Sequence, residues 1–124
     1  MKLSTIEKLH STLSTLTQKP MPLRLAYKFT KLASQIEEDY SFFIDKTREI
    51  IFKYAQIDEN GNIKHNDQGN IIIKPDCISQ TNQELQELEE IDIDSPNITF
   101  TLDELEGLDI SPADLQPLLP FIEE

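Results

Sequence analysis

The feature that most constrains the fold is a stretch of 33 residues, Leu23 to Ala55, that contains neither glycine nor proline. Apolar side chains recur in it every three or four positions, which is the period of one face of an α-helix. A helix of this length would measure about 48 Å, longer than a small globular domain needs. Its apolar seam is expected to comprise Leu25, Phe29, Leu32, Ile36, Tyr40, Phe43, Ile50 and Tyr54.

Another helix is predicted ahead of it, over about residues 4 to 17, because four leucines and Ile6 fall at helical spacing on one side. The connector Gln18–Pro22 ends this helix, since its two prolines lack amide donors. Such a short connector favours an antiparallel pair, in which the shorter helix covers the first part of the longer one.

The composition changes at Gln56, and two turn signals follow. Asn60-Gly61 is typical of a tight hairpin, and residues 66–70 form a second turn before the β-branched run Ile71–Ile73. The economical prediction is a small β-hairpin or three-stranded meander over residues 57–75. The chain is not expected to contain a repeat of fixed period.

Residues 76–124 carry three signals for the start of a helix. Thr81–Glu84 and Thr101–Glu104 match the capping box, in which side chains at both ends of the motif satisfy backbone amides. Ser111-Pro112 places serine at the N-cap and proline at the first helical position. Short strands are predicted at Ile91–Ile93 and Ile98–Phe100.

These signals together predict an α+β fold that is mainly helical. We expect a single domain, residues 1–124, with an N-terminal antiparallel helix pair that includes one long helix. Its parts are a helical hairpin (1–56), a β-hairpin (57–75) and an acidic region of capped helices and short strands (76–124). The short C-terminal helices are expected to pack back on the long helix.

The formal charge of −12 is unevenly distributed. Residues 1–56 carry nine cationic and six acidic side chains, whereas residues 57–124 carry two and 17. Direct nucleic-acid binding is therefore not expected, because phosphate neutralisation requires clustered cations. A helical stripe of Arg24, Lys28 and Lys31 is the natural internal neighbour of the acidic half. No apolar run approaches the ~18 residues that span a bilayer, so no membrane association is expected.

No catalytic, cofactor-binding or metal-binding residue is predicted. His10 and His65 lack partners at ligand spacing and are expected to be solvated, and Cys77 lacks a positioned base. The spacing of a calcium loop begins at Asp58 and then fails, because isoleucine and glycine occupy the positions of the required glycine and glutamate. We interpret that segment as a turn.

Seven of the nine aromatic residues lie in the predicted long helix. Neighbouring positions such as Phe42 and Phe43 point about 100° apart, so one covered face cannot bury them all. Either later segments of the chain cover a second face, or the remainder binds a partner protein or a second copy. The candidate partner-binding residues are off-seam aromatics and acidic side chains: Phe42, Phe52, Glu87, Glu90, Asp92 and Asp94.

Five short motifs are spread over nearly the whole chain: Met1–Leu3, Leu23–Lys28, Asp58–Asn62, Leu102–Leu108 with Ile110–Pro112, and the final Ile122–Glu124. In this combination the sequence resembles a family of small proteins of unknown function encoded by tailed bacteriophages and prophages, mainly of Gram-positive bacteria. The resemblance implies a phage origin and a helix-pair-plus-hairpin architecture. It brings no catalytic or ligand residues.

The leading hypothesis is a non-catalytic phage accessory protein that binds another protein of host or phage, for which a basic surface is the natural complement. One alternative is a virion or assembly component that forms homo-oligomers through the long helix. Another is an inhibitor whose acidic surface mimics nucleic acid and occupies the basic channel of a host defence or DNA-processing enzyme. The expected location is the host cytoplasm, or the virion under the first alternative.

Overall fold

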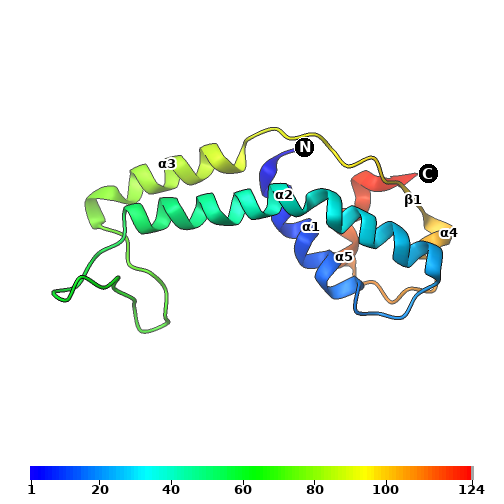
Figure 1. Ribbon diagram of the computed structural model, residues 1–124, viewed down its shortest axis with the longest axis horizontal. Coiled ribbons are helices and arrows are strands. Elements are labelled where there is room, and N and C mark those ends of the chain that lie inside the picture. Colours follow the sequence, from blue (N-terminus) through cyan, green and yellow to red (C-terminus); the bar gives the residue numbers. More distant parts are fainter. Residues whose placement is uncertain (124) are drawn as a thin grey trace.

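The computed structural model describes residues 1–123, which are mainly helical (Figure 1). The two predicted N-terminal helices are confirmed as α1 (Leu3–Leu16) and α2 (Leu23–Lys53). A third helix, α3 (Ile78–Glu89), lies along the second half of α2. The molecule is therefore elongated along α2, with a bulky end where α1 packs and a slender end where α3 packs (Figure 1).

The remaining helical elements are short. A 3₁₀ turn, η1 (Pro75–Cys77), runs directly into α3, and the C-terminal region contains α4 (Leu102–Leu105) and α5 (Pro112–Leu115). A second 3₁₀ segment, η2 (Gln116–Phe121), continues α5 and packs against α1.

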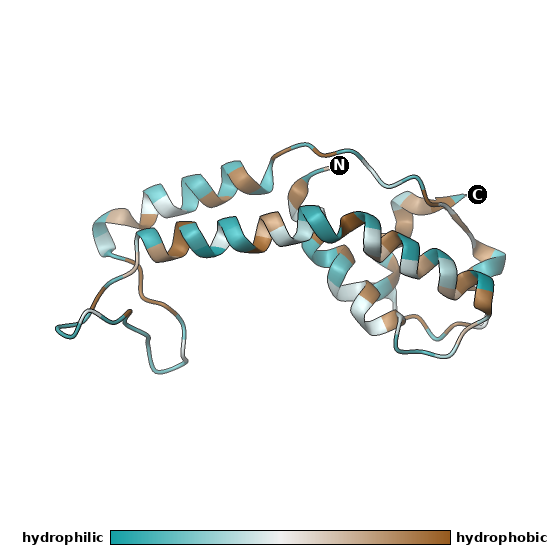
Figure 2. Cartoon of the chain, in the orientation of Figure 1, coloured by the Kyte–Doolittle hydropathy of each residue, from teal (hydrophilic) through white to brown (hydrophobic). Residues whose placement is uncertain are grey.

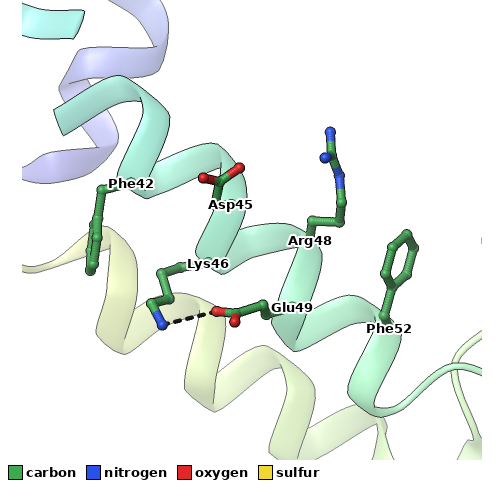
Figure 3. Close-up of a pocket in the computed structure, with 6 residues that line it drawn as sticks. All are labelled: Phe42, Asp45, Lys46, Arg48, Glu49 and Phe52. Carbon is green, nitrogen blue, oxygen red and sulfur yellow. Dashed lines mark ion pairs between the residues drawn. The ribbon is translucent and has the colours of Figure 1, made fainter. Parts of the chain in front are cut away.

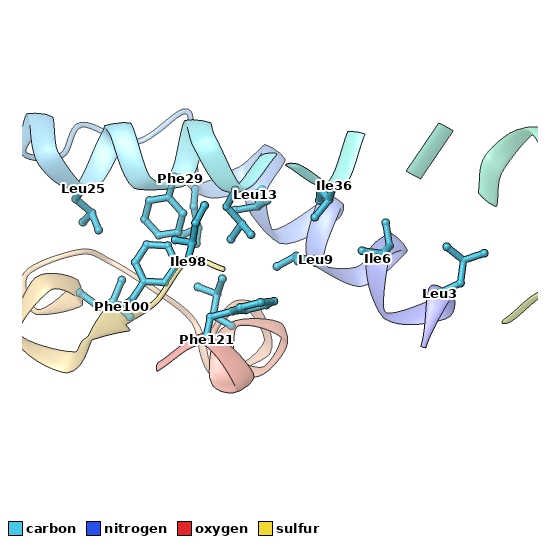
Figure 4. Packing of buried hydrophobic residues seen from close by; sticks show 14 of the residues in the cluster. Leu3, Ile6, Leu9, Leu13, Leu25, Phe29, Ile36, Ile98, Phe100 and Phe121 are labelled. Atoms are coloured by element: carbon cyan, nitrogen blue, oxygen red, sulfur yellow. The ribbon is translucent and has the colours of Figure 1, made fainter. Parts of the chain in front are cut away.

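The core lies between α1, the first half of α2 and the C-terminal segments (Figure 4). At its centre the rings of Phe29 and Phe100 stack with their centroids 4.8 Å apart, and both side chains are fully buried. Most of its other buried members are leucines and isoleucines of α1 and α2: Leu3, Ile6, Leu9, Leu13, Leu16, Leu25, Leu32 and Ile36. The periodic seams that predicted the two helices thus supply most of the core.

The predicted hairpin or meander over residues 57–75 is wrong. The one sheet within residues 1–123 has two parallel strands, β1 (Phe100–Thr101) and β2 (Ile122–Glu123), with Phe100 opposite Ile122. Residues 57–75 make only isolated antiparallel bridges. The strand expected at Ile91–Ile93 is likewise reduced to one bridge, between Asp92 and Lys2.

Residues 57–64 and 65–72 are two copies of one eight-residue turn, so the expectation of no fixed repeat is also wrong. Oδ1 of Asp58 accepts hydrogen bonds from the amides two and four residues ahead, and Oδ1 of Asn66 does the same. Gly61 and Gly69 occupy equivalent places, each with φ of +82°. Because these side chains use the amides that a ladder would need, each copy closes after a single bridge.

One capping prediction fails and two are confirmed. Thr81 does not cap α3, because η1 starts the helix three residues earlier, and the buried Thr81 hydroxyl donates to the Cys77 carbonyl at 2.7 Å. The Thr101 hydroxyl accepts from the Glu104 amide at 3.1 Å, and the Glu104 carboxylate accepts from the Thr101 amide at 3.1 Å. Ser111 caps α5 as predicted.

Replacing Phe100 by alanine is expected to lower the free energy of unfolding by about 3–5 kcal/mol, because the ring is fully buried in a packed core. Urea denaturation followed by circular dichroism measures the loss. The matched control is Phe42→Ala, whose exposed ring is expected to contribute roughly 1 kcal/mol or less. Equal losses from the two substitutions would contradict this placement of the core.

Candidate functional site

We call residues 40–53 of α2 together with α3 the arm, because they extend away from the end where α1 packs (Figure 1). Along the arm α3 covers one side of α2, and Phe43 and Leu88 are buried. The rest of α3 is largely hydrophilic (Figure 2), and its only other buried residue is Thr81. The opposite side of α2 is not covered by α3.

Phe42 and Phe52 lie on this uncovered part of α2, and each ring is 45% exposed. They line the two ends of a shallow groove whose other lining residues are also on α2 (Figure 3). Lys46 Nζ lies 2.9 Å from a Glu49 carboxylate oxygen and 5.9 Å from the centre of the Phe42 ring. Two large apolar side chains are thus presented to solvent among charges.

The four acidic candidates follow one another from α3 into the connector. Glu87 and Glu90 are exposed and each accepts a long hydrogen bond, at 3.4 Å, from a glutamine four residues earlier. Asp92 pairs with Lys2 at 3.4 Å, and Asp94 lines a separate shallow pocket beside α2. None of the four lines the groove between the phenylalanines, so the predicted residues form two surfaces instead of one.

Three ion pairs join cations of the first half of the chain to acids of the second. They are Lys2–Asp92, Lys28–Glu104 and Lys53–Glu84, with nitrogen–oxygen distances of 3.4, 2.8 and 3.2 Å. The prediction that the basic stripe neighbours the acidic half is confirmed at Lys28. Asp92 therefore already has a partner, whereas Glu87 and Glu90 form no ion pair within residues 1–123.

Lys53, Tyr54 and Glu84 meet where the end of α2 lies against the middle of α3. The Glu84 carboxylate beside the phenol raises the pKa of Tyr54, and the phenol in turn lowers the pKa of Glu84. Contact with Tyr54, and then with Glu84, raises the pKa of Lys53. The cluster therefore favours charged Glu84 and Lys53 at neutral pH, and it joins the middle of α3 to the end of α2.

His10 is partly exposed, and its ring stacks on Tyr40 with centroids 3.5 Å apart and only 3° between planes. In the part of the chain that the structure describes, no group of three or more His, Cys, Asp or Glu side chains could hold a metal ion. None of the helices within residues 1–123 is long and apolar enough to cross a membrane.

Asp45 and Arg48 are surface residues that the sequence reasoning missed. With Ser41 and Phe52 they fall at positions i, i+4, i+7 and i+11, which form one stripe on a helix. Figure 3 shows Asp45, Arg48 and Phe52 extending from one side of α2. The spacing was a usable signal, but the sequence did not show which side of α2 the later segments would cover.

Comparison of the chain with family models, with curated proteins and with solved structures finds no significant match.

Replacing Glu104 by glutamine isolates the Lys28 interaction, because glutamine also completes a capping box. Hydrogen bonding from Lys28 lowers the pKa of Glu104 below its ordinary value of 4.5. The stabilisation is therefore present above that value and is lost as the pH falls through the lower pKa of the folded state.

The wild-type protein is expected to exceed Glu104→Gln in unfolding free energy by roughly 1 kcal/mol or less at neutral pH, since the pair is partly exposed. The difference should shrink steadily below pH 4.5. Urea titrations at several pH values measure it, and a difference that is constant down to strongly acidic pH would contradict the assignment.

Proposed function

We propose that this chain is a non-catalytic protein that acts by binding another protein. The observation that carries the proposal is the exposure of Phe42 and Phe52 on the arm, where neither α1 nor α3 covers them. Exposed aromatic side chains on a rigid helix are typical of protein interfaces, because they bury a large apolar area with little loss of conformational freedom.

The acidic side chains supply a second, electrostatic part of the proposed surface. Glu87 on α3 and Glu90 directly after it are exposed, and both lie in the half of the chain that carries 17 acidic and two cationic residues. A partner with a basic surface is the complement that such charges select, and they would speed its approach.

The proposal includes a phage origin, which the family resemblance supports, and the host cytoplasm as the place of action. It also includes the finer architecture of an antiparallel helix pair with the C-terminal helices packed back on the long helix. The Lys28–Glu104 pair, which joins α2 to α4, supports that architecture.

The decisive experiment is affinity capture from cells infected with the source phage, using the intact tagged protein. Phe42→Ala combined with Phe52→Ala is expected to reduce recovery of the proteins that co-purify with the wild type by at least roughly tenfold, as losses of interface aromatics do. Quantitative mass spectrometry measures the recovery.

The matched control is Leu23→Ala combined with Tyr27→Ala, because these side chains are also exposed on α2 but lie at its other end. The control should leave recovery unchanged, and both double variants should retain the wild-type urea midpoint. Unchanged recovery with the Phe42 and Phe52 variant would overturn the proposal.

Glu87→Gln combined with Glu90→Gln tests the electrostatic part on a partner so captured. The variant is expected to bind more weakly at low salt and to lose less affinity as salt rises, because two screened attractions are gone. Titration calorimetry at several salt concentrations measures this, with Glu59→Gln plus Asp67→Gln in the exposed turns as the charge-matched control. An unaltered salt dependence would count against a role for the α3 acids.

A further inference from the structure

The uncovered side of α2 carries a stripe with an ordered pattern of charge. We define the α2 stripe as Ser41, Asp45, Arg48 and Phe52, which lie at i, i+4, i+7 and i+11 and are all exposed. It spans about 18 Å of helix. Phe42, Lys46 and Glu49 flank the stripe on the adjacent side (Figure 3).

Within residues 1–123, the charged side chains on the stripe form no ion pair, whereas the two charged side chains beside it pair with each other. Lys46 and Glu49 form an ion pair at 2.9 Å. Asp45 and Arg48 take part in no ion pair within residues 1–123, although they lie one helical turn apart. An exposed acid and an exposed base that leave each other unpaired are available to an outside partner.

The order of these charges makes the stripe complementary to itself. If two copies of α2 pack antiparallel with a two-fold axis between residues 46 and 47, residues at equal distances from the axis face each other. Asp45 of each copy then faces Arg48 of the other. Phe52 of each copy lies against the turn at Ser41 and Phe42 of the other. Parallel packing would instead set like charges together.

From this pattern we infer that the α2 stripe binds a second copy of this chain, forming a two-fold symmetric dimer through the arms. This inference goes beyond the proposed function, because it assigns the stripe on the uncovered helix to a second copy of this chain. In the dimer, α2 and α3 of both copies form a four-helix arrangement, which covers a helix more completely than a two-helix arm can.

The size of the stripe sets the expected strength of the dimer. A contact along only about 18 Å of one helix is expected to bury less surface than the ~1,200–2,000 Å² typical of stable complexes. We therefore expect a reversible dimer with a dissociation constant in the micromolar range or weaker. Glu87 on α3 and Glu90 directly after it stay available to a basic partner.

Sedimentation equilibrium on the purified intact protein, from micromolar to near-millimolar concentration, tests the inference. The wild-type average mass should rise toward twice that of the monomer. Asp45→Arg alone and Arg48→Asp alone should each weaken association by at least roughly tenfold, because each brings two pairs of like charges together. The matched control, Glu59→Arg in an exposed turn, makes the same change in net charge as Asp45→Arg and should leave association unchanged.

Two complementation arms distinguish a second copy from any other occupant. An equimolar mixture of the Asp45→Arg and Arg48→Asp proteins should associate, since every charge then faces its opposite. The double variant Asp45→Arg plus Arg48→Asp should also regain self-association. Circular dichroism and urea midpoints confirm that all variants are folded.

A wild-type protein that stays monomeric at all concentrations, or single variants that do not complement when mixed, would overturn the inference. Equal weakening by Glu59→Arg would do so as well. These results leave the capture experiment with Phe42 and Phe52 untouched, because that experiment measures other proteins recovered from cells. Conversely, failure of the capture experiment would leave the measured dimer standing.

Discussion

The packing of α1 against the first half of α2 determines where everything else lies. α1 has 14 residues and is about 21 Å long, whereas α2 has 31 residues and is about 46 Å long. α1 therefore cannot cover the whole of α2, and along the arm the buried core narrows to Phe43 and Leu88. The C-terminal segments add Phe100, Leu118 and Phe121 to that same core instead of extending it along α2. In the second half of α2, the packing partner is α3.

α3 buries only one side of α2, because most of the surface of α3 is hydrophilic. Polar contacts fix its position at two places: Lys53 and Tyr54 meet Glu84 at its middle, and the connector after it pairs with the N-terminus. There the Leu3 amide donates to the Ile91 carbonyl at 2.8 Å, and the Ile93 amide donates to the Met1 carbonyl at 2.9 Å. These contacts hold α3 on one side of α2 and leave the α2 stripe exposed.

The elements with strong local signals could be predicted from the sequence, and those that depend on distant neighbours could not. Apolar periodicity predicted α1 and α2 within two residues at each end. The capping box succeeded at Thr101 and failed at Thr81, because Pro75 upstream starts a 3₁₀ turn that leads directly into α3. The parallel pair of Phe100 and Ile122 has only two residues in each strand and joins positions far apart in the chain, so no local pattern marks it.

The candidate surface shows the same division. The angular offset of Phe42 from the seam was enough to predict that a single covered face would not bury it. The role of Asp45 and Arg48 depends on which side of α2 receives α3, and this side is set by the Glu84 cluster and the connector. By contrast, the eight-residue repeat was present in the sequence, with Asp or Asn at its second position, Gly at its fifth and Asn at its sixth. It was missed because only one of the two turns has the Asn-Gly pair that marks a hairpin.

The net charge of −12 opposes association of two copies, but this repulsion and the proposed Asp45–Arg48 contact act over different distances. Two copies with this charge repel each other over long distances, but at physiological salt the repulsion is screened beyond about 8 Å. Asp45 and Arg48 would meet at contact distance across the two-fold axis, where screening is weak. Moreover, the acids nearest the first half of the chain are already paired with Lys2, Lys28 and Lys53. For the proposed dimer, the local order of charge on the α2 stripe therefore matters more than the total charge.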